Sequence, residues 1–428
     1  MVGIYACGPT VYGRIHIGNA RPYVIFTLLR RFLAHEGFDP KLVINVTDIN
    51  DKIYAAAREA GTPSGEFAAR MTAAYREDTD RLGIGRPDAE PLATETIPEI
   101  VALIEELIER DHAYESGGDV YYRVRSFPEY GKLSNRDPDQ MDQGEEAGTA
   151  SLKEDPLDFA LWKATKAGED TSWDSPWGKG RPGWHIECSA MAEKQLGPEF
   201  AVHGGGIDLV FPHHENEIAQ TEGARGTPLA RVWMHNGMVQ IDEAKMSKSE
   251  GNIFQLSEAL DRYGPPAVVA YLASGHYRQP LAFSDDALSE ASARVERIRN
   301  YLKSRGAPGG DPDPFVTEKR EAFIEALADD FNTPRAFAAL SELVAEGNRR
   351  DLPGAGDALG ELLPLLGLES LLEGDEGADP EAERLLAERQ EARAAKDFER
   401  ADEIRNRLAE LGWEVRDEAG GARLVRRG

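Results

Sequence analysis

Cysteine is scarce in this chain of 428 residues, which contains only Cys7 and Cys188. Two thiols exclude a small secreted scaffold held by several disulfides, and they remain available as metal ligands or as inert side chains. Long apolar runs are also missing, since none approaches the roughly 18 to 20 residues of a membrane span, and no signal peptide precedes Cys7. We therefore expect a cytoplasmic protein of two or three domains that needs no membrane and acts as a monomer.

Positive charge is scarce as well, because 49 lysines and arginines face 76 acidic residues and the formal net charge is −27. Binding to phosphates normally calls for a basic surface, so the composition by itself argues against a nucleic-acid partner. Acidic runs at 143–146 and 373–376 lie in expected loops, and we interpret the excess as the solvated surface of a halophilic protein. The alternative is an acidic mesophilic protein with a local basic face. A melting curve against KCl separates the two.

The N-terminal part has the pattern of a βαβ unit. A strand is predicted at 3–7, a turn at Gly8 and Pro9, a helix from about 19 to 35, and a second strand at 41–46. Short connections of this kind imply parallel strands, which favours a doubly wound, Rossmann-like α/β fold. Strand-like pieces at 200–202 and 231–234 resume the pattern after an irregular region that contains a strand-like piece at 120–124.

The C-terminal third reads as helical beyond Tyr263, with a Pro- and Gly-rich linker at 306–314, a second break at 373–380 and a helix at 381–411. We see no internal repeat. The predicted organisation is as follows: 1–110, first half of the α/β domain; 111–182, insertion; 183–255, second half of the α/β domain; 256–305, helical stem; 306–428, helical module with a small tail.

Two short strings favour a nucleotide site. Residues 16–19, His-Ile-Gly-Asn, fall at a helix N-terminus, where backbone N–H groups attract phosphate. Taken alone they are more typical of an ordinary turn with a capping Asn19. Residues 245–249, Lys-Met-Ser-Lys-Ser, place Lys245 and Lys248 three apart in an expected loop, which suits neutralisation of a triphosphate. Two lysines without any other signal are typical of a solvated loop, but the two strings together favour a nucleotide site.

A metal site is the second hypothesis. The candidate ligands are Cys7, Cys188, His213 and Glu217, with His185 and His214 as alternatives. His213 and Glu217 are four residues apart and so share one helix face. Two thiolates, an imidazole and a carboxylate suit zinc, which tolerates mixed sulfur, nitrogen and oxygen ligands. The alternative interpretation is two inert buried cysteines.

Three further features offer polar groups to a ligand. The glycines at 204–206 follow a strand and allow close approach of backbone, and Asp208 offers a carboxylate to an amine or a ribose. Residues 45–48, Asn-Val-Thr-Asp, end a strand at the edge where ligands bind in open α/β sheets. Trp184 could line a pocket or pack in the core. Each feature also has a plain structural interpretation as a loop, a turn or a core residue.

Taken together, these strings resemble the cysteinyl-tRNA synthetases, a class I family. Beyond 16–19 and 245–249, the resemblance rests on Cys-Gly-Pro-Thr-Val-Tyr at 7–12, Gly-Trp-His-Ile-Glu-Cys-Ser at 183–189 and Phe-Pro-His-His-Glu-Asn-Glu at 211–217. It extends from Gly3 to Arg427. It implies that the helical module binds the anticodon and that the partners are tRNA(Cys), L-cysteine and ATP.

The resemblance also implies roles for single residues. Zinc would be held by Cys7, Cys188, His213 and Glu217, and the thiolate of the substrate would join it, so serine is rejected without editing. The amino acid would lie among Thr10, Thr47, Trp184 and Asp208. ATP, with Mg²⁺, would be served by His16, Gly18, Asn19, His235, Lys245, Lys248 and Ser249. Of these, His16, Asn19, Lys245 and Lys248 are expected to be catalytic, in attack of the cysteine carboxylate on the α-phosphate followed by transfer to tRNA.

The chain departs from the family pattern at two points. Cys7 follows only six residues, whereas the family has a longer N-terminal segment, so we expect the strand before Cys7 to be a poorly supported sheet edge that frays. Asn19 stands where class I enzymes often have a second histidine. Because its side chain still forms hydrogen bonds, we expect ATP binding to be retained.

Two alternatives differ in function. A cysteine ligase of the mycothiol-synthesis type would activate cysteine and pass it to an amino sugar; the helix at 381–411 and the basic end at 423–427 argue against it. A non-catalytic tRNA-binding or zinc-storage protein would not need the lysine string at 245–249, which is intact.

Overall fold

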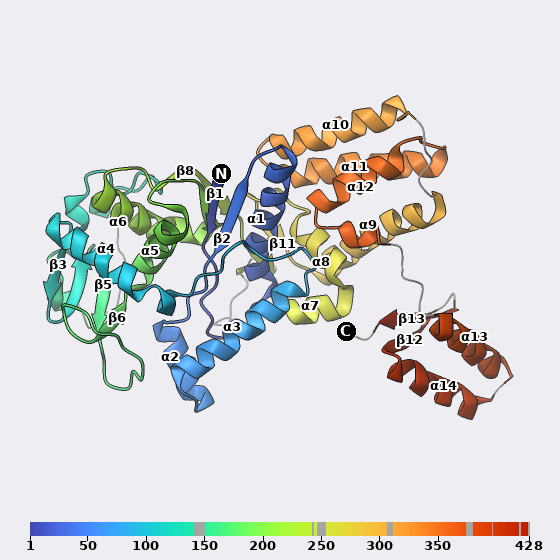
Figure 1. Ribbon diagram of the computed structural model, residues 1–428, viewed down its shortest axis with the longest axis horizontal. Helices are drawn as coiled ribbons and strands as arrows, with labels where there is room; N and C mark the ends of the chain where they lie inside the picture. Colours follow the sequence, from blue (N-terminus) through green and yellow to red (C-terminus); the bar gives the residue numbers. More distant parts are fainter. Residues whose placement is uncertain are drawn as a thin grey trace. The chain divides into compact units, whose positions relative to one another are not determined.

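The computed structural model describes residues 1–140, 150–241, 244–245, 254–305, 311–373, 380–395, 397–418 and 421–426. The chain divides into two compact units, Met1–Ser370 and Leu371–Gly428, which Figure 1 draws from blue to red. None of the described helices is long and apolar enough to cross a membrane. The five-part division predicted from the sequence stays a prediction.

A four-stranded parallel sheet forms the centre of the first unit, in the order β2-β1-β7-β8. Its strands are β1 (Val2–Ala6), β2 (Pro40–Ile44), β7 (Phe200–Gly206) and β8 (Ala230–Asn236). The expectation that β1 is a fraying edge is wrong. Ile4 pairs with Leu42 on one side and with Val202 on the other, so neighbours on both sides hold this five-residue strand.

Helix α1 (Ile17–His35) connects β1 to β2, as the βαβ pattern predicts. The helix begins two residues before its predicted start because the Asn19 side chain accepts a hydrogen bond from the His16 N–H, 3.2 Å. Strand β2 ends at Ile44 and not at Val46, since the Val46 N–H turns away to donate to Pro91 O, 2.9 Å. The parallel α/β class predicted from the sequence is confirmed.

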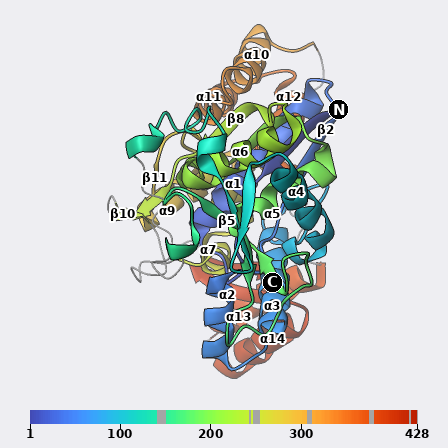
Figure 2. The ribbon, with the colours of Figure 1, turned by 90° about the vertical axis from the view of Figure 1, so that its left-hand side faces the viewer.

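Helices cover both faces of this sheet, as Figures 1 and 2 show. On one face Tyr5 and Cys7 join an apolar cluster with Cys188 of α5 (Trp184–Leu196) and Ile218 of α6 (Glu215–Arg225). On the other face α1 lies against β7 so closely that a Cβ on Gly204 would come within 2.4 Å of the Phe26 ring. Burial on both faces is typical of parallel strands.

An antiparallel sheet lies within the stretch predicted as an insertion. Its order is β3-β4-β5-β6, and its strands are β3 (Ala113–Ser116), β4 (Asp119–Tyr122), β5 (Phe159–Ala164) and β6 (Gly180–Pro182). The strand predicted at 120–124 ends earlier, at Tyr122, because Arg123 donates its N–H to His112 O and Val124 opens a short 3-10 turn. Tyr122, Phe159 and Trp162 fill the core beneath this sheet. Along the chain, α2 (Asp51–Ala60), α3 (Ser64–Asp80) and α4 (Ile97–Glu109) lie between β2 and β3.

The rest of the first unit is mostly helical. Its elements are β9 (Val239–Ile241), β10 (Ala244–Lys245), α7 (Leu256–Tyr263), α8 (Pro265–Leu272), β11 (Leu281–Ala282), α9 (Asp285–Arg305), α10 (Pro314–Ala328), α11 (Thr333–Arg349) and α12 (Ala355–Leu365). Arg31 and His35 connect α1 to this helical part. Arg31 donates to Pro364 O at 2.7 Å, and the His35 ring lies 2.8 Å from the Glu361 carboxylate.

The second unit contains α13 (Pro380–Ala394), α14 (Phe398–Glu410) and the hairpin of β12 (Trp413–Glu418) and β13 (Gly421–Arg426). The single helix predicted at 381–411 is therefore two helices. Asp397 starts the second, because its side chain accepts a hydrogen bond from the Arg400 N–H, 3.1 Å. The small core consists of Ala382, Leu385, Ile404, Leu408 and Val415.

Candidate active site

A cavity of about 720 Å³ opens at the carboxyl ends of the parallel strands. The chain connects β1 to β2 on one side and β7 to β8 on the other, so the direction of winding reverses between β1 and β7. Ligands of open α/β sheets bind at such a reversal point. Ten of the sequence-predicted site residues line this one cavity: Cys7, Thr10, His16, Gly18, Asn19, Thr47, Trp184, Cys188, Asp208 and His213.

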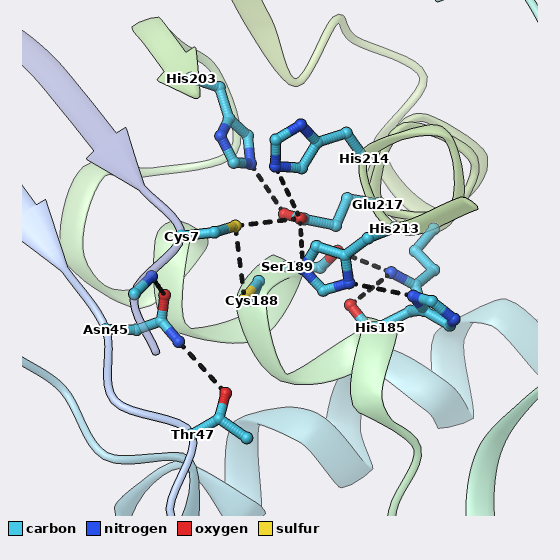
Figure 3. A network of polar contacts seen from close by, with 12 residues as sticks. Cys7, Asn45, Thr47, His185, Cys188, Ser189, His203, His213, His214 and Glu217 are labelled. Atoms are coloured by element: carbon cyan, nitrogen blue, oxygen red, sulfur yellow. Dashed lines mark hydrogen bonds and ion pairs between the residues drawn. The ribbon is translucent and has the colours of Figure 1, made fainter. Parts of the chain in front are cut away.

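At one end of the cavity, four predicted metal ligands converge (Figure 3). Cys7, Cys188, His213 and Glu217 each offer a ligand atom, and these atoms lie within 4.8 Å of one another. The two Sγ atoms are 3.7 Å apart, and Nε2 of His213 lies 3.0 Å from Oε1 of Glu217. All four side chains are buried, Cys7 being the most exposed at 9%. We call these four residues the cysteine–histidine cluster.

Two of the four members of the cysteine–histidine cluster, Glu217 and Cys188, have pKa values shifted toward the deprotonated form. Burial alone would lower the pKa of His213, but Glu217 and Cys188 raise it to about 10. Burial alone would raise the pKa of Glu217, but His203 and His213 hold it well below its usual range. A hydrogen bond from Cys7, together with His213, lowers the pKa of Cys188 to about 6, while burial raises that of Cys7. The cluster thus holds a carboxylate and a readily formed thiolate, which are the forms that bind metal ions.

Further histidines surround this cluster. His203 Nε2 lies 2.8 Å from Oε2 of Glu217, His185 Nδ1 lies 3.0 Å from Nδ1 of His213, and His214 Nδ1 lies 2.8 Å from Nε2 of His235. Of the alternatives left open by the sequence, His214 belongs to a second possible ligand set with Cys7, His203 and Glu217, whereas His185 belongs to neither. With the cysteine–histidine cluster as the ligand set, His185 and His203 are orienting partners: His185 contacts the His213 ring and His203 contacts the Glu217 carboxylate.

The backbone around Cys7 is fixed by a close approach of two strand ends. The Gly8 N–H donates to Oδ1 of Asn45 at 3.0 Å, and a Cβ on Gly8 would come within 1.7 Å of Asn45 O. Glycine is therefore required there. Helices α5 and α6 are joined by Gln220, which donates to His185 O and to the Ser189 hydroxyl. These contacts position the segments that carry Cys7, Cys188, His213 and Glu217.

The predicted amino-acid residues lie beside the cluster. The Trp184 ring stacks on His213 with a centroid separation of 4.3 Å, so it lines the cavity and does more than fill the core. Thr10 and Thr47 form a bridge between the ends of β1 and β2. Asp208 lies in the short turn Ile207–Leu209 after the glycines of β7, and a Cβ on Gly206 would come within 2.4 Å of its carboxylate.

His16, Gly18 and Asn19 lie at the opposite end of the cavity, at the N-terminus of α1. Ile17 donates its N–H to Phe254 O at 3.0 Å, so the chain that follows the lysine string returns to this helix end. Lys245 lies in β10, but its side chain, Lys248 and Ser249 are outside the described residues. His235 is not in the cavity wall and contacts His214 instead.

Sequence reasoning missed several residues of this wall. Arg14, Tyr75, Asn236 and Met238 line the cavity, and their side-chain types carry no motif that would have marked them. The role of His203 was missed although the neighbouring glycines at 204–206 were noted, because its contact with Glu217 joins β7 to α6. A larger cavity, about 1030 Å³, runs along one face of α3, but no predicted site residue except Asp48 of the 45–48 string lines it.

Comparison with known proteins identifies the fold and the class. Residues 1–293 match the family described as tRNA synthetases class I (C) catalytic domain, 322–367 match the DALR domain, and 375–424 match the cysteinyl-tRNA ligase anticodon binding domain. A methionyl-tRNA synthetase from Mycobacterium tuberculosis shares the fold, with a TM-score of 0.64, 15% identity and coverage of 86% of this chain and 88% of that one. The sheet, its cavity and these matches define a class I aminoacyl-tRNA synthetase.

Relatives identify the family within that class. The chain is 48% identical to a cysteine–tRNA ligase of Chromohalobacter salexigens over 99% of this chain and 95% of that protein. It is 47% identical to one of Methylobacillus flagellatus over 98% and 94%. The chain belongs to the cysteine–tRNA ligase family, which confirms the resemblance found in the sequence.

Proposed function

We propose that this protein joins L-cysteine to tRNA(Cys) in an ATP-dependent reaction that passes through cysteinyl-adenylate. The observation that carries the proposal is that one cavity has the cysteine–histidine cluster at one end and the N-terminus of α1 at the other. The first end suits a thiol and the second suits a phosphate. Membership of the cysteine–tRNA ligase family supports the same conclusion.

The donor set of the cysteine–histidine cluster fits zinc. Two thiols, one imidazole and one carboxylate converge in a buried site, and soft sulfur ligands with a borderline nitrogen favour zinc over magnesium or calcium. When bound by Cys7, Cys188, His213 and Glu217, zinc supplies an affinity for the thiolate of cysteine that the hydroxyl of serine lacks. Binding of this kind discriminates by several orders of magnitude, so no editing is required.

The remaining polar groups position the other parts of cysteine. In our proposal Trp184 covers the substrate side chain where it stacks on His213. The Asp208 carboxylate attracts the substrate ammonium, and Thr10 and Thr47 bound the pocket at the ends of β1 and β2. This arrangement directs the substrate carboxylate toward the N-terminus of α1.

ATP would lie over that N-terminus, beside His16, Gly18 and Asn19. We propose that Lys245 and Lys248 would neutralise phosphate charge of ATP, that the Ser249 hydroxyl would bind a phosphate through a hydrogen bond, and that Mg²⁺ would supply further positive charge. His235, which lies outside the cavity wall, would also serve ATP. A carboxylate oxygen of cysteine attacks the α-phosphorus, and the bond to the bridging oxygen breaks, which releases pyrophosphate. A hydroxyl of the terminal ribose of tRNA then attacks the carbonyl carbon, and AMP leaves. Positioning and charge stabilisation carry the rate, without a protein nucleophile.

Charging of total tRNA with labelled cysteine, with serine as the control, tests the proposal. We expect acid-precipitable cysteine and no serine, and loss of cysteine-dependent ATP–pyrophosphate exchange in Lys248→Ala. Exchange without charging would point to the amino-sugar ligase, an alternative that the anticodon-domain match at 375–424 does not favour. Absence of both activities would contradict the proposal and point to a binding protein.

We further propose that the protein is a cytoplasmic monomer with a salt-adapted surface. The support is its size, its family and its net charge of −27. Size-exclusion chromatography at low and molar KCl tests the first part. A melting temperature that rises with KCl supports the second part, and greatest stability at low salt contradicts it.

A further inference from the structure

Arg21, one turn inside α1, is a buried cation beneath the cavity wall. Its side chain is 1% exposed, which makes it one of the largest fully buried side chains of the protein. The guanidinium donates to three backbone carbonyls: Nη1 to Gly237 O at 2.6 Å, Nη1 to Gln279 O at 2.7 Å, and Nη2 to His276 O at 3.0 Å. Its Nε–H has no partner among the described residues.

No carboxylate within the described part of the chain is paired with Arg21. Burial lowers the pKa of Arg21 to about 10, and the guanidinium stays charged at neutral pH. The nearby ionisable groups are the Tyr271 phenol on α8 and, in the turn after it, His276 and Arg278, whose side chains are engaged with Asp330. Burying a charge without an opposite charge is costly, and the three hydrogen bonds to carbonyls offset part of that cost.

The carbonyls that Arg21 binds belong to two segments that cross. The Gly237 N–H donates to Tyr277 O at 2.7 Å, and a Cβ on Gly237 would come within 2.3 Å of Gln279 O. Gly237 belongs to the cavity wall together with Asn236, Met238 and Val239, which face the same cavity as His16 and Asn19. Arg21 therefore links α1, whose N-terminus is the proposed ATP-binding end of the cavity (the nucleotide end), to the part of the wall formed by residues 236–239.

The contact between these two segments also supports β9 and β10, the strands that precede the lysine string at 245–249. Leu281 of β11 pairs with Val239 of β9, and β9 pairs in turn with β10, which ends at Lys245. The start of α1 also touches β9, because a Cβ on Gly18 would lie 3.5 Å from Cβ of Val239. A change in the position of Gly237 would thus shift both the cavity wall at 236–239 and strands β9 and β10, which lead to the lysine string at 245–249.

We infer that Arg21 is a positioning residue for ATP: through the carbonyls of Gly237, His276 and Gln279 it sets the distance between the start of α1 and the 236–239 wall. The inference rests on the proposed function, because it needs ATP to occupy this end of the cavity. Arg21 does not touch the substrate. The cysteine–histidine cluster lies at the other end and is not expected to respond to it.

Steady-state ATP–pyrophosphate exchange on the full chain tests the inference through the separate KM values for ATP and cysteine. Arg21→Met keeps the length of the side chain and removes the charge and the donors. The matched control is Arg30→Met, on the same helix, whose guanidinium donates to Arg86 O at 2.9 Å away from the cavity. We expect R21M to raise the KM for ATP at least about ten-fold with a change of less than about two-fold for cysteine, and R30M to alter neither.

Arg21→Lys is a second test, which can be used if R21M does not fold. Its readout is the pH dependence of ATP binding, which a purely structural role of Arg21 would not change. A lysine has three donors for the three carbonyls. Burial lowers the pKa of its ammonium enough for the charge to be lost within the tested pH range, whereas a guanidinium keeps its charge. R21K should therefore bind ATP like wild type near pH 6.5 and lose affinity as the pH rises toward 9, whereas wild type should not.

The outcomes separate the inference from the proposed function. An unchanged KM for ATP in a folded R21M, equal effects on ATP and cysteine, or an R21K that follows the wild-type pH profile would overturn the inference and leave the synthetase proposal standing. A wild-type protein without cysteine-dependent exchange would overturn the proposed function, and the inference with it.

Discussion

The two ends of the cavity are built in different ways. The cysteine–histidine cluster consists of Cys7, Cys188, His213 and Glu217, and every member is buried. Cys7 follows β1, Cys188 lies in α5, His213 lies in the helical turn Val210–His214, and Glu217 lies at the start of α6. The end at which we propose ATP to bind, the nucleotide end, depends on the consecutive residues 16–19, in which Asn19 is exposed and accepts a hydrogen bond from the His16 N–H. The first end is therefore part of the core, and the second is a local turn. Substitutions at the first should have larger effects.

The largest expected effect comes from Cys188→Ser, which keeps the size of the side chain and removes a thiolate ligand. We expect loss of bound zinc and a fall of about a thousand-fold or more in kcat/KM for cysteine. Zinc content and pyrophosphate exchange measure it. Met191→Leu, a volume-conserving change at another buried residue of α5, is the control and should retain zinc. A C188S protein that keeps both metal and activity would contradict the role of the cluster.

His203→Ala should have the next largest effect. It removes the imidazole that lies 2.8 Å from Glu217 without removing a member of the cluster. Loss of such an orienting partner weakens metal affinity about 10- to 100-fold. Competition with a chromogenic chelator measures the affinity, and the KM for ATP should stay constant. A larger loss than that of C188S would show that His203 is itself a ligand, in the alternative set with His214.

Asn19→Ala tests the nucleotide end. The variant loses the side chain that accepts from the His16 N–H, a helix cap contributing about 1 kcal/mol. We expect the KM for ATP to rise by no more than about ten-fold, with the KM for cysteine and the zinc content unchanged. Asn19→Asp, which keeps the cap but brings a negative charge to the phosphates, should be worse for ATP than N19A. If N19A lost zinc, the two ends would not be separable.

The smallest effect is expected at the far end of α1, where His35 contacts Glu36 and Glu361. Burial alone would lower the pKa of His35, but hydrogen bonds to both carboxylates raise it above its ordinary value. The protonated ring therefore contributes stability fully below about pH 6.5, and this contribution is lost as the pH rises through the folded-state pKa. His35→Gln should remove this part of the pH dependence, a melting-temperature change of about 2 °C or less. An unchanged pH profile in H35Q would contradict it.

The sequence could predict the features whose cause is local. The βαβ unit follows from apolar periodicity, and the helix start at His16 to Asn19 follows from capping chemistry, with errors of two residues at the ends. The four members of the cluster were candidates by their side-chain types, but only the family resemblance separated them from His185 and His214, since nothing in their spacing brings residue 7 to residue 188. The support of β1 on both sides could not be predicted, because the pairing with β7 joins residues nearly 200 positions apart.

The same reason explains the residues that were missed. His203 acts only through the packing of β7 against α6, and Arg21 acts only through carbonyls at 237, 276 and 279, which have no side-chain signature. The division of the C-terminal helix at Asp397 carried a local signal, an Asp three residues before the Arg400 N–H, that helical periodicity on both sides obscured.

The measurement that tests the central claim most directly is the absorption spectrum of the cobalt-substituted protein, titrated with L-cysteine and, separately, with L-serine. Thiolate ligands give cobalt a charge-transfer band, so Cys7 and Cys188 should produce one before any substrate is added. We predict that cysteine strengthens this band and that serine leaves it unchanged. A band that does not respond to cysteine, or responds equally to both amino acids, would contradict selection of the substrate through its thiol.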